Sequence, residues 1–367
     1  MHRFKTENTR NLLTVEYLRA VLCVGIIMFH TSLPYAQMLW AGVQAFFVLS
    51  AFFMVLKLGT PNRPIAIGPL FRRRIARLYL PYLAVVALAV LYALLRRTAP
   101  LSIACDTALH GLGLQSFEWL FTGYSSPLQP MTAHTWTLGI EIWLYLVFLF
   151  LLKAVNRSQT AALKRVLILI AAGTVVYRCA AIGLGLNKNW VSLLPFAHLD
   201  AYALGGLAAI AYRENRERMR FLAARNILIG GALILASIFT TSQLHQVSFG
   251  SAYALYRTSD GYLHHIFTGQ IYLYLAIFWT GLLFAMIAIS DRWKVRDVRF
   301  LSNMGQDSYT LYLFHWPVCV VCKFFFDSVW VVFGLTVILT WTANLCYSFL
   351  EKLLKTRWET FHAAGRH

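Results

Sequence analysis

The sequence predicts an all-α fold: a polytopic membrane helical bundle of about ten transmembrane helices, with both termini cytoplasmic. Of its 367 residues, 59% are hydrophobic and 13% are charged, and the mean hydropathy is +0.59. A soluble domain of this size needs more polar surface than that. Many apolar runs are long enough to cross a hydrocarbon core about 30 Å thick. We therefore expect a single integral membrane domain over residues 1–367.

Each expected transmembrane helix is an apolar run bounded by charged or turn-forming residues. The ten runs lie near Leu12–His30, Trp40–Leu56, Ile75–Leu95, Thr135–Leu152, Val166–Gly183, Leu193–Ala211, Ile227–Thr241, Ile271–Ser290, Ser308–Phe326 and Val329–Leu350. Two long connections, Thr98–His134 and Ser242–Gln270, fall on the outer side. Connections of this length are functional or disordered, and the aromatic residues in these two favour an ordered cover over a site.

The charge pattern sets the orientation. The chain has 33 Lys and Arg against 15 Asp and Glu, a formal net charge of +18. If the N-terminus is inside and the runs alternate, 26 of the 33 basic residues fall in inner segments. This asymmetry is the positive-inside pattern, and it explains the basic excess without a nucleic-acid partner.

Two basic side chains interrupt the first run. Arg19 and His30 lie roughly 16 Å apart along a helical axis. Ionisable groups inside a membrane helix are costly, so the pair is a functional hypothesis by default. The alternatives are that Arg19 extends to the inner headgroups and that His30 forms a hydrogen bond at the interface.

Further polar residues are expected in the bundle. Glu141 and Asp200 lie early in runs that enter from outside, and His315 lies about two turns into the ninth run. The arginine cluster of Arg72, Arg73 and Arg77 lies inside, where it could bind phosphates or serve only as a topogenic charge. An inner phosphate site and an outer histidine base suit acyl transfer from a cytoplasmic acyl-CoA across the membrane, with a carboxylate orienting the histidine.

No metal site or bound cofactor is expected. Cys319 and Cys322 form a CxxC pair, but no second ligand pair accompanies it. His264 and His265 are adjacent in an outer loop, and no third ligand is evident.

Six segments carry a family resemblance. In chain order they are Tyr17–His30 (arginine, ten residues, histidine), Ala41–Ser50 (AGVQAFFVLS), Arg72–Leu83 (RRRIARLYLPYL), Trp136–Glu141 (WTLGIE), His198–Gly205 (HLDAYALG) and Ser308–Pro317 (SYTLYLFHWP). Together they resemble the acyltransferase-3 family of integral membrane O-acyltransferases, and most closely its exopolysaccharide O-acetyltransferase branch. Gln44, Ala51 and His198 stand where the family commonly has Asp, Gly and Arg, so no catalytic role is assigned to Gln44 or His198.

The resemblance implies an activity and a set of site residues. The expected reaction uses acetyl-CoA as a co-substrate and acetylates a hydroxyl of an exopolysaccharide or its lipid-linked precursor, at the bacterial cytoplasmic (inner) membrane and alongside polysaccharide synthesis machinery. His30 would be the general base or an acyl-carrying nucleophile, and Glu141 would orient it. The remaining candidates are Arg19, Arg72, Arg73 and Arg77 for the donor, and Asp200, Trp136, Tyr309 and His315 elsewhere in the site.

Three alternatives remain open. The same buried charges could form a substrate or proton path in a transporter or flippase, although no repeat of two related halves is visible. The chain could also be an export subunit whose charged residues are dispensable. Within the acyltransferase reading, a succinyl donor would need one extra cation, for which Arg178 or Arg257 is available.

Overall fold

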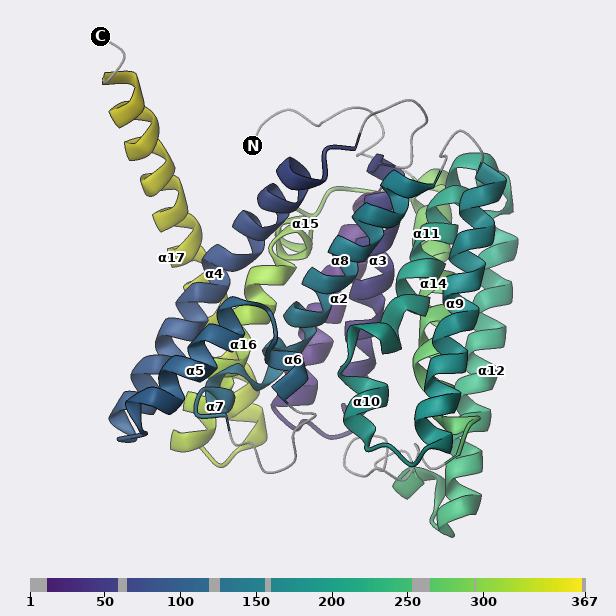
Figure 1. Ribbon diagram of the computed structural model, residues 1–367, viewed down its shortest axis with the longest axis horizontal. Coiled ribbons are helices and arrows are strands. Elements are labelled where there is room, and N and C mark those ends of the chain that lie inside the picture. Colours follow the sequence, from purple (N-terminus) through teal and green to yellow (C-terminus); the bar gives the residue numbers. More distant parts are fainter. Residues whose placement is uncertain are drawn as a thin grey trace.

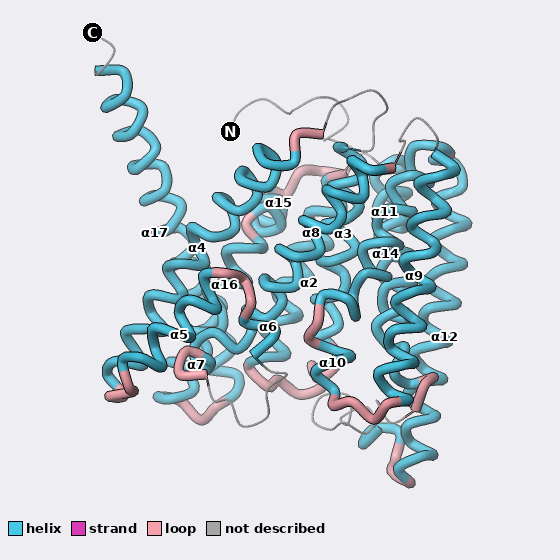
Figure 2. The backbone as a smooth tube through the Cα atoms, viewed as in Figure 1, coloured by secondary structure: helices cyan, strands magenta, loops and turns pink. Residues whose placement is uncertain are grey.

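The computed structural model describes residues 12–58, 65–118, 126–155, 160–252, 265–293 and 295–364, with side chains as far as residue 353. Within these ranges every regular element is a helix (Figure 2). The elements, with 3-10 helices written η, are α2 Leu13–His30, η1 Leu39–Ala41, α3 Gly42–Leu58, α4 Ile67–Leu95, α5 Pro100–Gly111, α6 Gln115–Glu118, α7 Gln129–Thr132, η2 Ala133–Thr135, α8 Trp136–Ala154, α9 Thr160–Gly183, α10 Lys188–Ser192, η3 Pro195–His198, α11 Leu199–Glu214, η4 Arg216–Arg218, α12 Met219–His245, η6 Thr268–Gln270, α14 Ile271–Arg292, α15 Arg299–Gln306, α16 Ser308–Phe325 and α17 Val329–Ala364.

The helical membrane fold is confirmed. Eight helical segments of the described chain are long and apolar enough to cross a membrane. They contain α2, α3, α4, α8, α9, α12, α14 and α17. The other two expected runs form α11, which has 16 residues, and α16, which contains Pro317. All ten runs are therefore helical.

Several helix boundaries differ from the expected ones. Helix α4 begins at Ile67 rather than Ile75, so the arginine cluster lies within the helix. The run expected to be shortest becomes the 27-residue α12, which continues through polar residues at both ends. Polar residues such as Arg and Lys have good helix propensity, so a helix can extend beyond its apolar run. The short helix α15 was not expected.

The helices are arranged around α2, α3 and α8 (Figure 1). Helices α9, α11, α12 and α14 lie on one side of this centre, and α4, α16 and α17 lie on the other. Helix α2 contacts α3, α14, α15 and α16, which joins the two halves. A residue on α2 can thus contact elements from widely separated parts of the chain.

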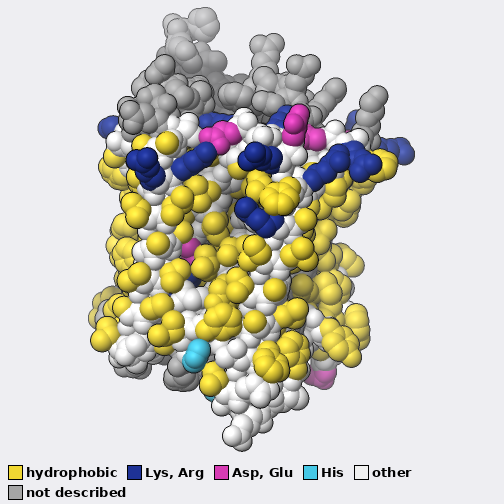
Figure 3. Space-filling model, turned by 90° about the vertical axis from the view of Figure 1, so that its right-hand side faces the viewer, with side chains coloured by type: hydrophobic (Ala, Val, Ile, Leu, Met, Phe, Trp, Pro, Cys, Tyr) yellow, Lys and Arg dark blue, Asp and Glu magenta, His cyan; other side chains and the backbone are white. Residues whose placement is uncertain are grey.

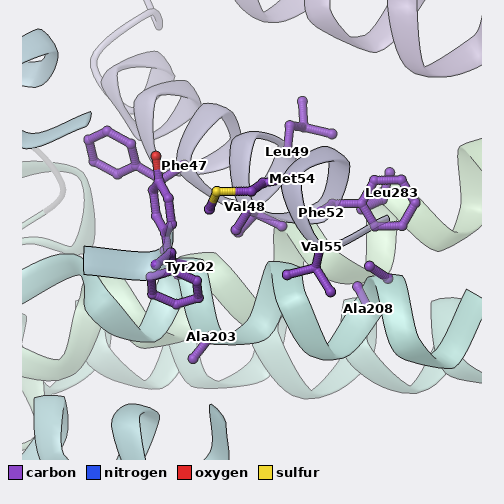
Figure 4. Packing of buried hydrophobic residues seen from close by; sticks show 14 of the residues in the cluster. Phe47, Val48, Leu49, Phe52, Met54, Val55, Tyr202, Ala203, Ala208 and Leu283 are labelled. Carbon is purple, nitrogen blue, oxygen red and sulfur yellow. The ribbon is translucent and has the colours of Figure 1, made fainter. Parts of the chain in front are cut away.

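Helices α3 and α11 pack closely against each other. Phe47, Val48 and Phe52 of α3 pack against Tyr202 and neighbouring small residues of α11 (Figure 4). A Cβ added at Gly205 would collide with the carbonyl oxygen of Val48. Small residues let membrane helices approach this closely, which explains the glycine in the motif that begins at His198.

Basic side chains gather at one end of the molecule, above a surface that is mainly hydrophobic (Figure 3). We call this the basic end. It includes η4, which carries Arg216, and the C-terminal end of α14, which carries Arg292. The N-terminal end of α2 and the C-terminal end of α17 also lie there (Figure 1). This placement agrees with the expected orientation, in which the basic end faces the cytoplasm.

The connection expected over residues 98–134 is ordered where the structure describes it. Its helices α5, α6 and α7 lie at the far end, opposite the basic end (Figure 1). Helix α5 contacts α4, α7 contacts α4 and α16, and α6 contacts α8. Arg257, Asp260 and His264 of the other long connection lie outside the described residues.

Candidate active site

His30 ends α2 at the far end of the bundle, where it is half-buried. Its ring centroid lies 5.1 Å from that of His315 and 4.8 Å from that of Trp316. The first and ninth expected runs therefore bring two predicted site residues together. We call His30, His134, His315 and Trp316 the histidine cluster.

His315 presents a nitrogen lone pair to this cluster. The residue is fully buried on α16, and its Nδ1 lies in hydrogen-bond contact with the carbonyl oxygen of Tyr312. A carbonyl can only accept, so Nδ1 carries the proton and Nε2 keeps its lone pair. Nε2 has no hydrogen-bond partner among the described residues. A buried nitrogen left in this state can accept a proton from an incoming group.

His134 is a member of the cluster that sequence reasoning missed. It lies in η2, just before α8, and its ring centroid is 5.3 Å from that of His315. Its Nε2 donates to the carbonyl oxygen of Leu313 at 3.0 Å, which leaves Nδ1 as the lone-pair nitrogen. That nitrogen is buried without a hydrogen-bond partner in the described chain. The only signal in the sequence is its position two residues before the Trp136–Glu141 motif.

Hydrogen bonds tie the elements of the cluster together. The carbonyl oxygen of His30 accepts from Lys323 Nζ at 2.7 Å, which joins α2 to α16. Trp316 Nε1 donates to the carbonyl of Pro130 at 3.0 Å, and the Tyr312 hydroxyl donates to that of His134 at 2.7 Å. The three histidines are thus positioned by backbone contacts between α2, α16 and η2.

Glu141 forms an ion pair with Arg74 of α4, which differs from the expected contact with His30. Ser50 Oγ lies between the two, 3.2 Å from Glu141 Oε1 and 3.0 Å from Arg74 Nη2. Tyr202 donates its hydroxyl to the same Ser50 oxygen at 3.2 Å, and the Arg74 guanidinium lies over the Tyr145 ring. The expectation that Glu141 orients His30 is therefore replaced by a polar centre that joins α3, α4, α8 and α11.

The predicted donor-binding arginines separate into two groups. Arg72 and Arg73 are exposed on α4 near the basic end. Arg77 is also exposed, and it interacts electrostatically with Arg74, Glu141 and Arg19. Arg19 itself pairs with Glu16 one turn earlier on α2, at 2.9 Å. Arg77 therefore lies within electrostatic range of both Arg19 and the Arg74–Glu141 pair.

Asp200 belongs to a separate buried network. It pairs with Arg178 of α9, and both side chains are fully buried. Arg178 also donates to the Gln270 side chain at 3.0 Å and to the carbonyl of Ala197 at 2.9 Å. Arg178 therefore has a structural role. Because Asp200 balances its charge, Arg178 is not the extra cation considered for a succinyl donor.

Trp136 and Tyr309 each contact other residues of the protein and are partly buried. The Trp136 ring centroid lies 6.2 Å from that of His198. The Tyr309 hydroxyl donates to the carbonyl of Leu78 at 2.8 Å, which ties α16 to α4. Gln44 and His198, two of the departures from the family pattern, also contact each other: His198 Nδ1 lies 3.2 Å from Gln44 Oε1.

Comparison with known proteins now decides the family. The family model described as "Acyltransferase domain", that of the acyltransferase-3 family, matches residues 12–350. The chain belongs to the acyltransferase-3 family. The match runs from α2 to α17 and so includes both the histidine cluster and the Arg74–Glu141 pair.

A curated relative adds information on the reaction. The chain is 25% identical over 396 aligned positions to a protein of Bacillus subtilis (strain 168) provisionally named peptidoglycan O-acetyltransferase YrhL. The alignment covers 96% of this chain and 56% of that relative, so the chain spans little more than half the relative's length. No solved structure matches. The chain is therefore a multi-pass helical membrane protein of the acyltransferase-3 family.

Proposed function

We propose that this acyltransferase moves an acetyl group from cytoplasmic acetyl-CoA to a hydroxyl of a cell-surface glycan or of its lipid-linked precursor, with His30 as the general base. The family match and the relative's name support O-acyl transfer. The observation that carries the proposal is the contact of His30 with His315, next to His134. Three imidazoles at one point, two with available lone pairs, can accept the proton of a sugar hydroxyl.

The proposed reaction is one acyl exchange. The glycan hydroxyl gives its proton to His30 as its oxygen bonds to the thioester carbonyl carbon. The carbon–sulfur bond then breaks, and the imidazolium returns the proton to the leaving thiolate, which departs as CoA thiol. In place of a carboxylate, the neutral His315 ring beside His30 would position it and share its positive charge.

The donor is proposed to enter from the basic end. CoA carries phosphates, which guanidinium groups bind well, and exposed Arg72 and Arg73 lie at that end of α4. Arg77, which interacts electrostatically with Arg19 and Glu141, would contact the donor next. The acceptor, the bacterial cytoplasmic membrane and contact with polysaccharide synthesis machinery belong to the same proposal.

Mass analysis of the surface glycan tests the proposal. Cells lacking their own copy would produce the wild-type protein, His30→Ala, or the control His245→Ala, which changes an exposed histidine at the end of α12. We expect one acetyl increment per repeat with the wild type and the control, and none with His30→Ala at equal protein level in the membrane. An increment of one succinyl group would correct the donor.

Two outcomes would count against the proposal. Normal acetylation with His30→Ala would remove His30 as the base. Unmodified glycan in all strains, but less of it at the surface with His30→Ala, would instead favour the transporter or export-subunit alternative. Trapping an acetyl group on His30 in purified protein would separate a covalent relay from direct transfer.

A further inference from the structure

A second polar cluster lies at the far end, in the segment before the histidine cluster. Asp106 and His110 of α5 and Glu118 of α6 each direct a potential metal-ligating atom to one point. These atoms lie within 4.8 Å of one another, and all three side chains are buried. The acyl-transfer reaction proposed above uses none of them.

Asp106 is held so that one oxygen remains available. Its Oδ2 accepts from Ser126 Oγ at 2.5 Å and from the backbone N–H of Leu128 at 2.9 Å. Its Oδ1 is buried, accepts no hydrogen bond from any described residue, and lies 3.2 Å from His110 Nδ1. A carboxylate fixed through one oxygen by two donors presents the other oxygen in a defined direction.

His110 is oriented in the same way. The Thr132 hydroxyl gives its proton to the carbonyl of Leu128 at 2.8 Å, so it can only accept from His110 Nε2, 3.1 Å away. Nε2 therefore carries a proton. Nδ1 then has either a second proton, which it donates to the oxygen atoms that face it, or a lone pair that a bound cation can accept. Nδ1 faces oxygen atoms only: the Asp106 carbonyl at 3.0 Å, Asp106 Oδ1 at 3.2 Å and Glu118 Oε1 at 3.7 Å.

Lone pairs that converge in a buried space repel one another unless positive charge lies between them. Glu118 Oε1 is also buried and accepts no hydrogen bond from the described chain. We propose that this cluster is a binding site for a divalent transition-metal cation, of which Zn²⁺ is the representative, ligated by Asp106 Oδ1, His110 Nδ1 and Glu118 Oε1.

The spacing and the donor set suit this ion. Tetrahedral Zn²⁺ takes nitrogen and oxygen ligands at about 2.0–2.2 Å, so neighbouring ligand atoms lie about 3.3 Å apart. The Nδ1–Oδ1 and Nδ1–Oε1 distances of 3.2 and 3.7 Å are close to that edge length. A ligand set of one imidazole and two carboxylates favours Zn²⁺ over Ca²⁺ and Mg²⁺, because those two ions prefer oxygen ligands alone.

Protons compete with a metal cation for these three ligand atoms. Burial and the neighbouring Asp106 carboxylate raise the pKa of the Glu118 carboxyl to about 9, so in the absence of a cation this group is protonated at neutral pH. Metal binding would displace these protons, so the two states can be distinguished by direct measurement of bound metal.

A cation bound at this site would stabilise the turn at Thr132–Thr135, which carries His134. Its ligands join α5 to α6, and Thr132, which orients His110, lies two residues before His134. Gln115 Nε2 donates to the carbonyl of Thr135 at 2.9 Å, which links α6 to the same turn. A bound cation would therefore stabilise the turn that positions one imidazole of the histidine cluster.

Zn²⁺ titration of the purified, chelator-treated full-length protein tests the proposal, with bound metal measured by elemental analysis after removal of free ion. We expect one tightly bound equivalent in the wild type and in the control His245→Gln. Glu118→Gln should bind at least tenfold more weakly, since it loses a ligand. Thr132→Val, which only orients His110, should lose about tenfold in affinity.

Co²⁺ substitution in the wild type gives a second measurement that needs no variant. Absorption bands of tetrahedral Co²⁺ that Zn²⁺ abolishes at one equivalent would support the site even if Glu118→Gln does not fold. Equal Zn²⁺ binding by wild type and Glu118→Gln would overturn it. Failure of the wild type to bind either ion would also overturn it and assign the cluster to protons.

Discussion

Loss of one charge from the Arg74–Glu141 pair should destabilise the protein strongly. Glu141→Gln keeps the shape of the side chain and the Ser50 contact but leaves Arg74 unpaired among helices. The two side chains are only 17% and 19% exposed. Removal of one partner of a buried pair costs about 3–5 kcal/mol, and the partial exposure places this pair near 3 kcal/mol. That change shifts the folding equilibrium by about a hundredfold.

The surface pair Lys164–Glu214 provides a matched control. Its atoms approach to 2.5 Å, but its side chains are 40% and 44% exposed. Solvent screening limits such a pair to about 0–1 kcal/mol, so Glu214→Gln should have little effect. The free energy of unfolding would be measured for each purified variant in mixed micelles. Similar losses for Glu141→Gln and Glu214→Gln would refute the argument from burial.

A double variant separates stability from function. Arg74→Leu combined with Glu141→Leu removes both charges, and buried pairs replaced by apolar residues are often neutral in stability. We expect the double variant to regain most of the stability lost in Glu141→Gln. If it also acetylates glycan normally, the pair serves structure alone, whereas a folded but inactive protein would place the pair in the donor path.

Three further predictions concern packing and catalysis. Gly205→Ala should lower the free energy of unfolding by about 1–3 kcal/mol, because the added Cβ meets a backbone carbonyl. Gly231→Ala, whose Cβ meets nothing within 4 Å, should raise it by about 1 kcal/mol. Unfolding measurements on the two variants should therefore give changes of opposite sign. Gln44→Asp and His198→Arg should each lower the yield of folded protein, and the double variant should restore it; additive losses would contradict the contact. His134→Gln should lower glycan acetylation about 10²-fold or more at unchanged protein level, and full activity by mass analysis would exclude it from the cluster's chemistry.

The helices could be predicted because apolar runs of this length have few alternatives in a membrane. The ends of the helices could not be predicted, because hydropathy does not detect a helix that continues through polar residues, as α4 does before Ile75. The rotation of each helix about its own axis could not be predicted from hydropathy either. Arg72, Arg73 and Arg74 are adjacent in sequence, yet successive residues turn by about 100° around the axis, so only Arg74 reaches Glu141.

Part of the site could be predicted in the same way. His30 and His315 were selected individually as costly intramembrane groups, and the fold brings them together. His134 escaped because it lies in a polar turn, where a histidine is unremarkable. Asp106, His110 and Glu118 escaped because their meeting depends on the turn between α5 and α6, which has no helical or strand period.

The two departures from the family pattern that meet in space indicate compensation rather than loss of a site. The family commonly has an acidic residue at position 44 and an arginine at 198, which at this contact would form a buried ion pair. Here Gln44 and His198 replace it with a neutral contact, so neither position carries an unbalanced charge. The histidine cluster and the Arg74–Glu141 pair consist of other residues. The substitution therefore leaves the proposed chemistry intact while changing the polarity of the neighbouring α3–η3 contact.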